Sequence, residues 1–152
     1  MTTYDLLVTG HVVGAVAWVG SGTFSHVLGE RILKRGNGDE MATFLDDLGA
    51  LALRWFIPVS LLTVVCGIAA AIDGPWSFGA LWIDIGLAMF VISFLIGATY
   101  LGPQSEKLAK VAESEGADSQ TFRSGLKKFM TIGRFETALL WLTVIVMVIK
   151  PG

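Results

Sequence analysis

Four long runs of apolar residues divide the chain. They span Leu6–Leu28, Leu48–Ile72, Phe78–Leu101 and Phe135–Ile149. A helix needs about 20 predominantly apolar residues to cross the hydrocarbon core of a bilayer, and the first three runs reach that length. The fourth run is shorter. The pattern predicts an all-α integral membrane protein with one domain, residues 1–152, in which four antiparallel transmembrane helices form a bundle in contact with the lipid bilayer.

The polar segments between the runs differ in length. A tight turn is expected at residues 72–76, between the second and third runs. In the first connection, Gly36-Asn37-Gly38 predicts a turn, after which Asp39 can cap a helix that continues into the second run. In the third connection, apolar residues recur at helical spacing on both sides of Gly116, and Asp118 or Ser119 can cap the second of these helices. We expect both long connections to form helical extensions beyond the membrane; an amphipathic segment in the membrane plane is the alternative for the third.

Basic residues predict the orientation of the helices. Ten of the eleven lysines and arginines flank the first and third connections, and only Lys150 lies on the other side. Because basic residues accumulate in cytoplasmic loops, the extensions are predicted to be cytoplasmic and both termini outside. Aromatic residues are expected at both interfaces. They are Tyr4, Trp76 and Trp82 on the outer side and Trp55, Tyr100 and Phe129 on the inner side.

Composition supports a membrane location and narrows the function. Hydrophobic residues make up 53% of the chain and charged residues 16%, far from the balance of a soluble domain. No basic block suited to nucleic acid is present. Cys66 is the only cysteine, so no internal disulfide forms, and its position in an apolar run favours a small buried side chain. The residues before Leu6 lack a basic region, and we therefore expect the first run to be a retained helix and not a cleaved signal.

Small residues give the first helix a face for close packing. They are Gly10, Gly14, Ala17, Ser21 and Ser25, which recur at intervals of three and four. Such faces let helix backbones approach closely in lipid. This face therefore predicts docking to a neighbour, either a second copy of the chain or a subunit of a membrane complex. The adjacent stripe holds His11, Ala15, Trp18, Gly22 and His26.

Ionisable residues inside the spans fall into two layers. At 1.5 Å rise per residue, His11 and Asp84 lie about 7–9 Å below the outer boundary and can meet if their helices are neighbours. Either Asp84 accepts a hydrogen bond and simply joins two helices, or it orients His11 as a haem or metal ligand. The inner layer holds His26, Arg54, Arg134 and Glu136. We expect it to be mainly structural, with the arginines reaching lipid phosphate and Glu136 pairing with one of them.

The two histidines are unsuited to bind one metal ion together. They lie about 22 Å apart along a single helix by the same rise per residue, so a haem held by both histidines of one copy is excluded. Single axial ligation by His11, or a site shared between copies, remains open.

Several short motifs resemble a superfamily of small bacterial membrane proteins. They are His11 followed by Trp18-Val19-Gly20, then Arg54-Trp55-Phe56, Gly67, Gly102-Pro103 and the segment 147–151. The superfamily includes the copper-resistance D domain, the HemJ-type protoporphyrinogen oxidases and a family of uncharacterised predicted integral membrane proteins, which the chain resembles most. The resemblance implies a bacterial cytoplasmic membrane location. It also matches His11, together with Trp18, to the haem-binding first helix of the HemJ-type enzymes, which carry a functional lysine where this chain has Asp84.

Three functions fit these patterns. The first is a membrane protein that binds haem or a transition metal such as copper through His11, with or without redox activity. The second is a non-catalytic accessory or assembly subunit of a larger complex. The third is a small proton-coupled transporter that uses Asp84 or Glu136. Whether the chain is an enzyme is left open by the sequence.

Overall fold

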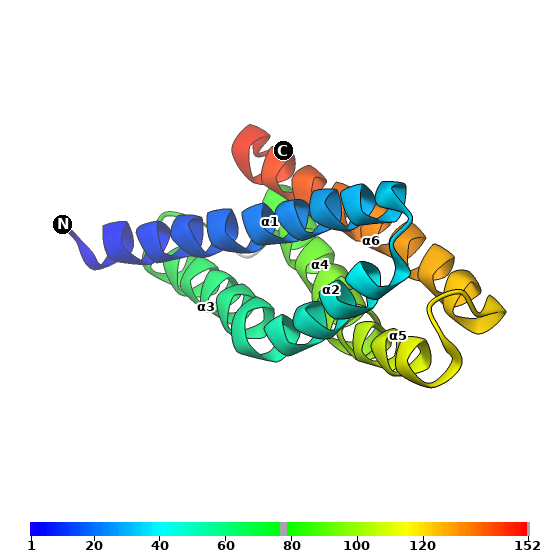
Figure 1. Cartoon of the computed structure of the whole chain (residues 1–152). Coiled ribbons are helices and arrows are strands. Elements are labelled where there is room, and N and C mark those ends of the chain that lie inside the picture. Colours follow the sequence, from blue (N-terminus) through cyan, green and yellow to red (C-terminus); the bar gives the residue numbers. More distant parts are fainter. Residues whose placement is uncertain (77–78, 152) are drawn as a thin grey trace.

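The computed structural model describes residues 1–76 and 79–151 as a bundle of helices (Figure 1). The elements are α1 (Thr3–Arg35), α2 (Gly38–Leu51), η1 (Ala52–Phe56), α3 (Ile57–Asp73), α4 (Leu81–Leu95), η2 (Ile96–Leu101), α5 (Gly102–Glu115) and α6 (Gln120–Ile149). The short elements η1 and η2 are π-helical and interrupt two otherwise continuous helices, Gly38–Asp73 and Leu81–Glu115.

The predicted fold class is confirmed. The described residues contain no strand, and four helices of 33, 36, 35 and 30 residues are long and apolar enough to cross a membrane. The first, second and fourth predicted runs each lie within one of them. The third helix begins at Leu81, so Gly79 and Ala80 of the third run precede it, and Phe78 lies outside the described residues. The chain is therefore a multi-pass membrane protein.

The helical extensions form as predicted. At a rise of 1.5 Å per residue, the helix Gly38–Asp73 is about 54 Å long, more than the bilayer core requires. Gly36 ends α1 in the left-handed region at φ 71°, and the Asn37 side chain caps α2 by accepting from the backbone of Asp39 and Glu40. Asn37, not Asp39, is thus the cap, because Asp39 already lies inside the first turn. Of the two candidates before α6, Ser119 is the cap.

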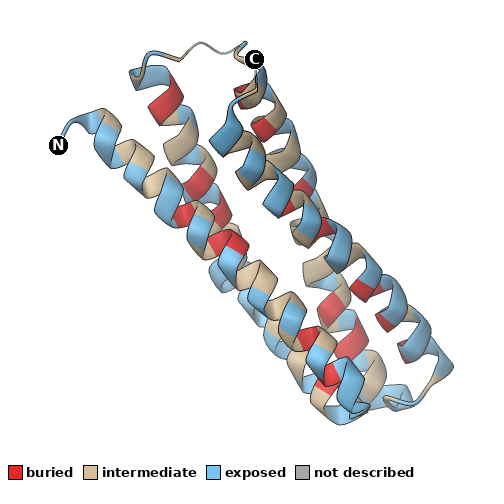
Figure 2. Cartoon of the chain, turned by 90° about the horizontal axis from the view of Figure 1, so that it is seen from above, coloured by how far each residue is buried: buried red, intermediate tan, exposed pale blue. Residues whose placement is uncertain are grey.

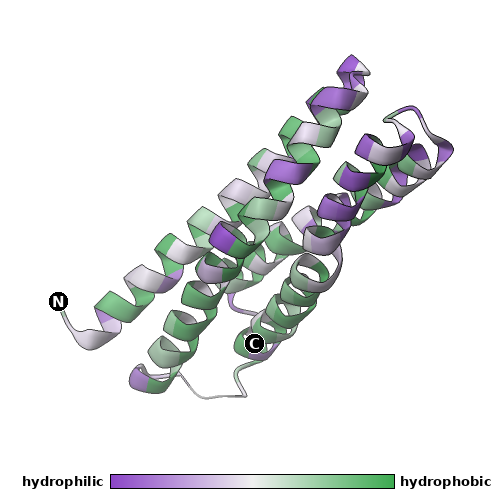
Figure 3. Ribbon diagram, turned by 60° about the horizontal axis from the view of Figure 1, so that its bottom comes forward, coloured by the Kyte–Doolittle hydropathy of each residue, from purple (hydrophilic) through white to green (hydrophobic). Residues whose placement is uncertain are grey.

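The two ends of the bundle differ in character. The turns after α1, at Gly36, and after α5, at Gly116, lie together at the polar end, since a Cβ on Gly38 would contact Ala117. The terminal end holds both chain termini (Figure 2). Hydrophilic residues gather at the polar end, as Figure 3 shows. At the terminal end, the Trp76 indole donates to the Tyr4 hydroxyl at 3.1 Å, and the Lys150 ammonium lies 4.4 Å from the Trp76 ring. Trp82 packs edge-on against Trp76, so the predicted outer aromatic residues form one cluster.

A hydrophobic core fixes the polar end. Its buried members are Ile32, Met41, Leu45, Leu108, Ala109, Phe122, Leu126, Phe129 and Met130. They come from α1, α2, α5 and α6, so the extensions are packed against each other and against the ends of the membrane helices. Phe129 was predicted to lie at the lipid interface and instead is buried here, because the helical face of Phe122, Leu126 and Phe129 turns inward.

The small-residue face of α1 packs against α3. A Cβ atom on Gly14 would lie 2.6 Å from the Thr63 hydroxyl oxygen, and one on Gly10 would lie 2.9 Å from the Cys66 sulfur. Gly10 and Gly14 of this face therefore make, within the chain, the close helix packing that small residues permit. Docking of a second copy or another subunit through the face of Gly10, Gly14, Ala17 and Ser21 stays a prediction.

Candidate functional site

A cavity of about 350 Å³ lies between the helices where the membrane part meets the polar end. All four long helices contribute to its walls. Trp18, Phe56, Phe94 and Leu140 supply much of the apolar surface. Polar groups reach it from several elements; they are Ser25, His26, Ser60, Ser93, Glu106, Glu136 and Thr137. A mostly apolar cavity with a few convergent polar groups is the usual form of a small-molecule site.

Glu136 is the buried carboxyl of this cavity. It lies on α6, is 9% exposed, and accepts a hydrogen bond of 2.7 Å from the hydroxyl of Ser93 on α4. Polar groups inside a membrane are costly, and they mark functional sites by default. Of the two carboxyl oxygens of Glu136, only Oε1 accepts a hydrogen bond within the described residues. No fully buried side-chain nitrogen or oxygen atom in this part of the chain lacks a hydrogen-bond partner. The second oxygen is therefore not fully buried, and Glu136 is one of the residues that line the cavity.

The charge of the lining favours a particular ligand chemistry. The ionisable residues among the described lining are two carboxyls, Glu106 and Glu136, and one imidazole, His26; none is lysine or arginine. Charged groups interact more strongly in a protein interior than in water, because the effective dielectric constant there is lower. The cavity suits a molecule that carries a cation or hydrogen-bond donors. The two propionates of a haem would find no lysine or arginine among the described lining residues.

Both π-helical segments line the cavity. Each ends two residues before a proline, Pro58 after η1 and Pro103 after η2. Proline lacks an N–H and clashes with the carbonyl four residues earlier. The wider π turn removes that conflict: the N–H of Ile57 donates to the Ala52 carbonyl, and that of Gly102 to the Gly97 carbonyl, each five residues back. Such π segments often occur at functional sites.

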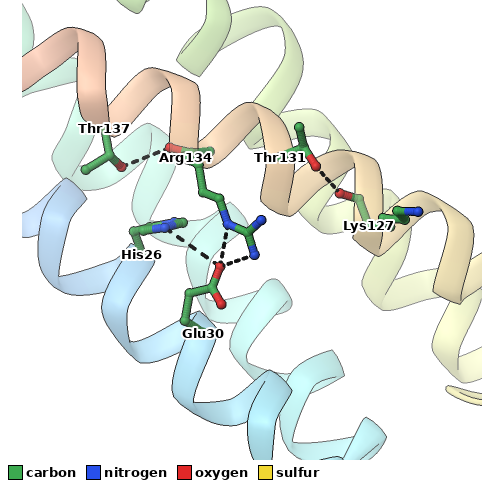
Figure 4. A network of polar contacts seen from close by, with 7 residues as sticks. His26, Glu30, Lys127, Thr131, Arg134 and Thr137 are labelled. Carbon is green, nitrogen blue, oxygen red and sulfur yellow. Dashed lines mark hydrogen bonds and ion pairs between the residues drawn. The ribbon is translucent and has the colours of Figure 1, made fainter.

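An ion-pair network joins α1 and α6 beside the cavity (Figure 4). Arg134 donates from Nε and Nη2 to one oxygen of Glu30, at 2.8 and 2.6 Å, and the Nε2 atom of His26 lies 3.9 Å from the same oxygen. Of the predicted inner layer, His26 and Glu136 both line the cavity, and Arg134 lies nearby.

The predicted partner of Glu136 is wrong. Glu136 pairs with neither Arg54 nor Arg134 but with Ser93. Successive residues of an α-helix are rotated by about 100° around its axis. Arg134 and Glu136, two positions apart, therefore point to nearly opposite sides of α6 and do not pair. Arg54 is exposed and makes no ion pair within the described residues.

His11 is held by α3. Its Nδ1 atom lies 2.8 Å from the carbonyl oxygen of Thr63. Because a carbonyl only accepts, Nδ1 carries the hydrogen and Nε2 keeps a free lone pair. Gly67 makes room for the ring, since a Cβ there would lie 2.6 Å from Nδ1. A histidine oriented in this way by a backbone carbonyl is typical of metal ligands, although it is equally a way to join two helices.

The predicted meeting of His11 and Asp84 does not occur. Asp84 is exposed on α4, whereas α1 packs mainly against α3 and α6. The described residues contain no group of three His, Cys, Asp or Glu placed to hold a metal ion. Trp18, the third predicted cofactor residue, is buried against Phe90 with ring centroids 5.5 Å apart, and it lines the cavity.

Sequence reasoning missed Ser60, Ser93 and the π segments. The two serines are 2% and 1% exposed, and both lie within apolar runs where a lone hydroxyl carries little signal. Pro58 and the Gly102-Pro103 pair were the available signal for the π segments, because each marks a place where the α-helical ladder must change. Comparison of the chain with protein-family models, curated proteins and solved structures finds no match.

Proposed function

We propose that this chain binds a small lipophilic amine in the cavity between η1 and η2, with Glu136 as the anchor. The carrying observation is the Glu136 carboxyl, which accepts a hydrogen bond from Ser93 and lines a mostly apolar cavity whose described lining has no lysine or arginine. The ligand class follows from this chemistry: an apolar body fills the aromatic walls, and one cationic head group bonds the free carboxyl oxygen.

Orientation and location extend this proposal. We infer a bacterial cytoplasmic membrane with both termini outside, on the basis of the ten basic residues at the polar end. The cavity then opens toward the cytoplasmic half of the bilayer. In this arrangement the chain acts as a carrier or receptor for the amine, which develops the transporter hypothesis on Glu136 and leaves Asp84, exposed on α4, without a role.

A matched series of probes tests this function. The probes are 1-aminoadamantane, 1-adamantanol and adamantane-1-carboxylate, which share one rigid apolar body and differ in head group. The purified protein in nanodiscs should bind the amine most tightly and the carboxylate least. Glu136→Gln should weaken amine binding roughly 10–100-fold, because a hydrogen bond to a charged group contributes about 1.5–3 kcal/mol.

The control is Glu113→Gln, which removes an exposed carboxylate of α5 that lies outside the cavity lining. It should bind all three probes as the parent does. Equal affinity of the parent for the three probes, or an unchanged amine affinity in Glu136→Gln, would rule out the proposal.

A second candidate is haem or transition-metal binding at His11. It is favoured by the hydrogen bond from Nδ1 to Thr63, which leaves Nε2 free as a ligand. His11 alone fits one axial position of a haem, and copper needs further ligands that the described residues do not place beside it. A Soret band in the purified parent that is absent in His11→Gln would support this candidate. The accessory-subunit alternative has less support, because Gly10 and Gly14 of the small-residue face pack against α3 within the chain.

A further inference from the structure

A second hollow lies on the surface next to the cavity. It has a volume of about 320 Å³ and runs between α1 and the helix formed by α2 and η1. Ser25, Leu48 and Phe56 line both this groove and the cavity. The groove and the cavity are thus separated by single side chains. Phe56 is the largest of these three shared side chains.

The groove faces the lipid. Its rim includes Phe24 and Leu51, whose exposed fractions are 67% and 45%. Trp55 crosses from η1 to α1, where its indole donates to the Ser21 hydroxyl at 3.1 Å. Both Trp55 and Phe56 belong to the π-helical segment, whose hydrogen bonds already depart from the α-helical ladder. Trp55 and Phe56 therefore lie on the part of the groove wall where the regular α-helical hydrogen-bond pattern is interrupted.

Acidic groups continue from the groove into the cavity. Asp47 lines the groove at its polar end, and Glu106 and Glu136 line the cavity. No lysine or arginine is among the described residues that line either space. The groove and the adjoining cavity accordingly favour the same cationic ligand.

We propose that this groove is the lateral entrance through which the lipophilic amine passes from the lipid into the cavity. This inference rests on the proposed function. Phe56 is the barrier between groove and cavity, the hydrogen bond between Trp55 and Ser21 is the latch, and Asp47 attracts the ammonium group at the mouth.

Filling the groove should slow exchange without changing affinity. Leu51 lines the groove but not the cavity, so Leu51→Trp obstructs the route and leaves the binding site intact. The matched control is Leu61→Trp, which changes a leucine of nearly the same exposure, 44% against 45%, on α3 outside both hollows. Rates are measured with tritiated 1-aminoadamantane and nanodisc-embedded protein by rapid filtration.

Leu51→Trp should lower the association and dissociation rates together by about tenfold, with an unchanged Kd, and Leu61→Trp should leave both rates as in the parent. Removing the latch with Ser21→Ala should raise both rates roughly two- to tenfold, the value of one hydrogen bond. Parent-like rates in both Leu51→Trp and Ser21→Ala overturn the entrance while leaving the site in place. Failure of the parent to bind the amine overturns the proposed function and the entrance with it.

Discussion

The packing of α1 against α3 can be tested at Gly67, where the two helices are held together by the ring of His11. In Gly67→Ala, the new Cβ would lie 2.6 Å from Nδ1 and 2.9 Å from Cε1 of that ring. Contacts this short force the ring away from α3. The hydrogen bond of 2.8 Å from Nδ1 to the Thr63 carbonyl is then lost.

The expected cost has two parts. Overpacking a well-packed contact costs about 1–3 kcal/mol, and the lost hydrogen bond costs about 0.5–1.5 kcal/mol. Gly67→Ala should therefore destabilise the protein by about 1.5–4.5 kcal/mol. Gly20→Ala is the matched control on α1, because a Cβ there meets no atom within 4 Å. It should be neutral or slightly stabilising, since alanine is the better helix former.

A double-mutant cycle identifies the cause. Truncation by His11→Ala removes the ring that the new methyl group strikes, so Gly67→Ala should cost much less in that background. The measurement is reversible unfolding of the four proteins in mixed micelles. Equal stability of Gly67→Ala and Gly20→Ala, or the same cost of Gly67→Ala with and without the His11 ring, would refute the described contact.

Three further outcomes follow from the same structure. Ser93→Ala should weaken amine binding about three- to tenfold because it frees the Glu136 carboxyl from its orienting hydrogen bond of 2.7 Å; unchanged affinity would mean that Ser93 plays no part. Glu30→Gln should change the unfolding free energy by no more than about 1 kcal/mol, since Arg134 is more than half exposed and such pairs are screened; a larger loss would show that the pair is a structural lock. In a Cys66→Ala background, an impermeant thiol reagent on intact cells should label Thr2→Cys and not Ser119→Cys; the reverse pattern would invert the topology.

The helices could be predicted because their signals are local. Hydropathy marks the four spans, and the extensions follow from helical spacing around Gly116 and from the turn at Gly36. The caps follow from short polar side chains such as Asn37 and Ser119 at helix starts. Even the outer aromatic cluster follows, because all of its members flank the spans on one side.

Side-chain partners were harder to predict because they depend on which helices become neighbours. The rise per residue sets only the depth of a residue along its helix. The direction in which a side chain points around the bundle axis depends on which helices pack together. Because α1 packs against α3, the partner of His11 is Thr63 and not Asp84. The pairing of Glu136 with an arginine failed for the same reason, although the two-residue spacing from Arg134 already argued against it.

The central claim is that the ammonium group of a bound amine lies against Glu136. Solid-state NMR tests it directly, through dipolar coupling between ¹⁵N-labelled 1-aminoadamantane and the side-chain carboxyl carbons of protein labelled with ¹³C on glutamate. A coupling present in the parent and in Glu113→Gln but absent in Glu136→Gln is the predicted result. A bound amine that shows no glutamate coupling, or one that persists in Glu136→Gln, would contradict the claim.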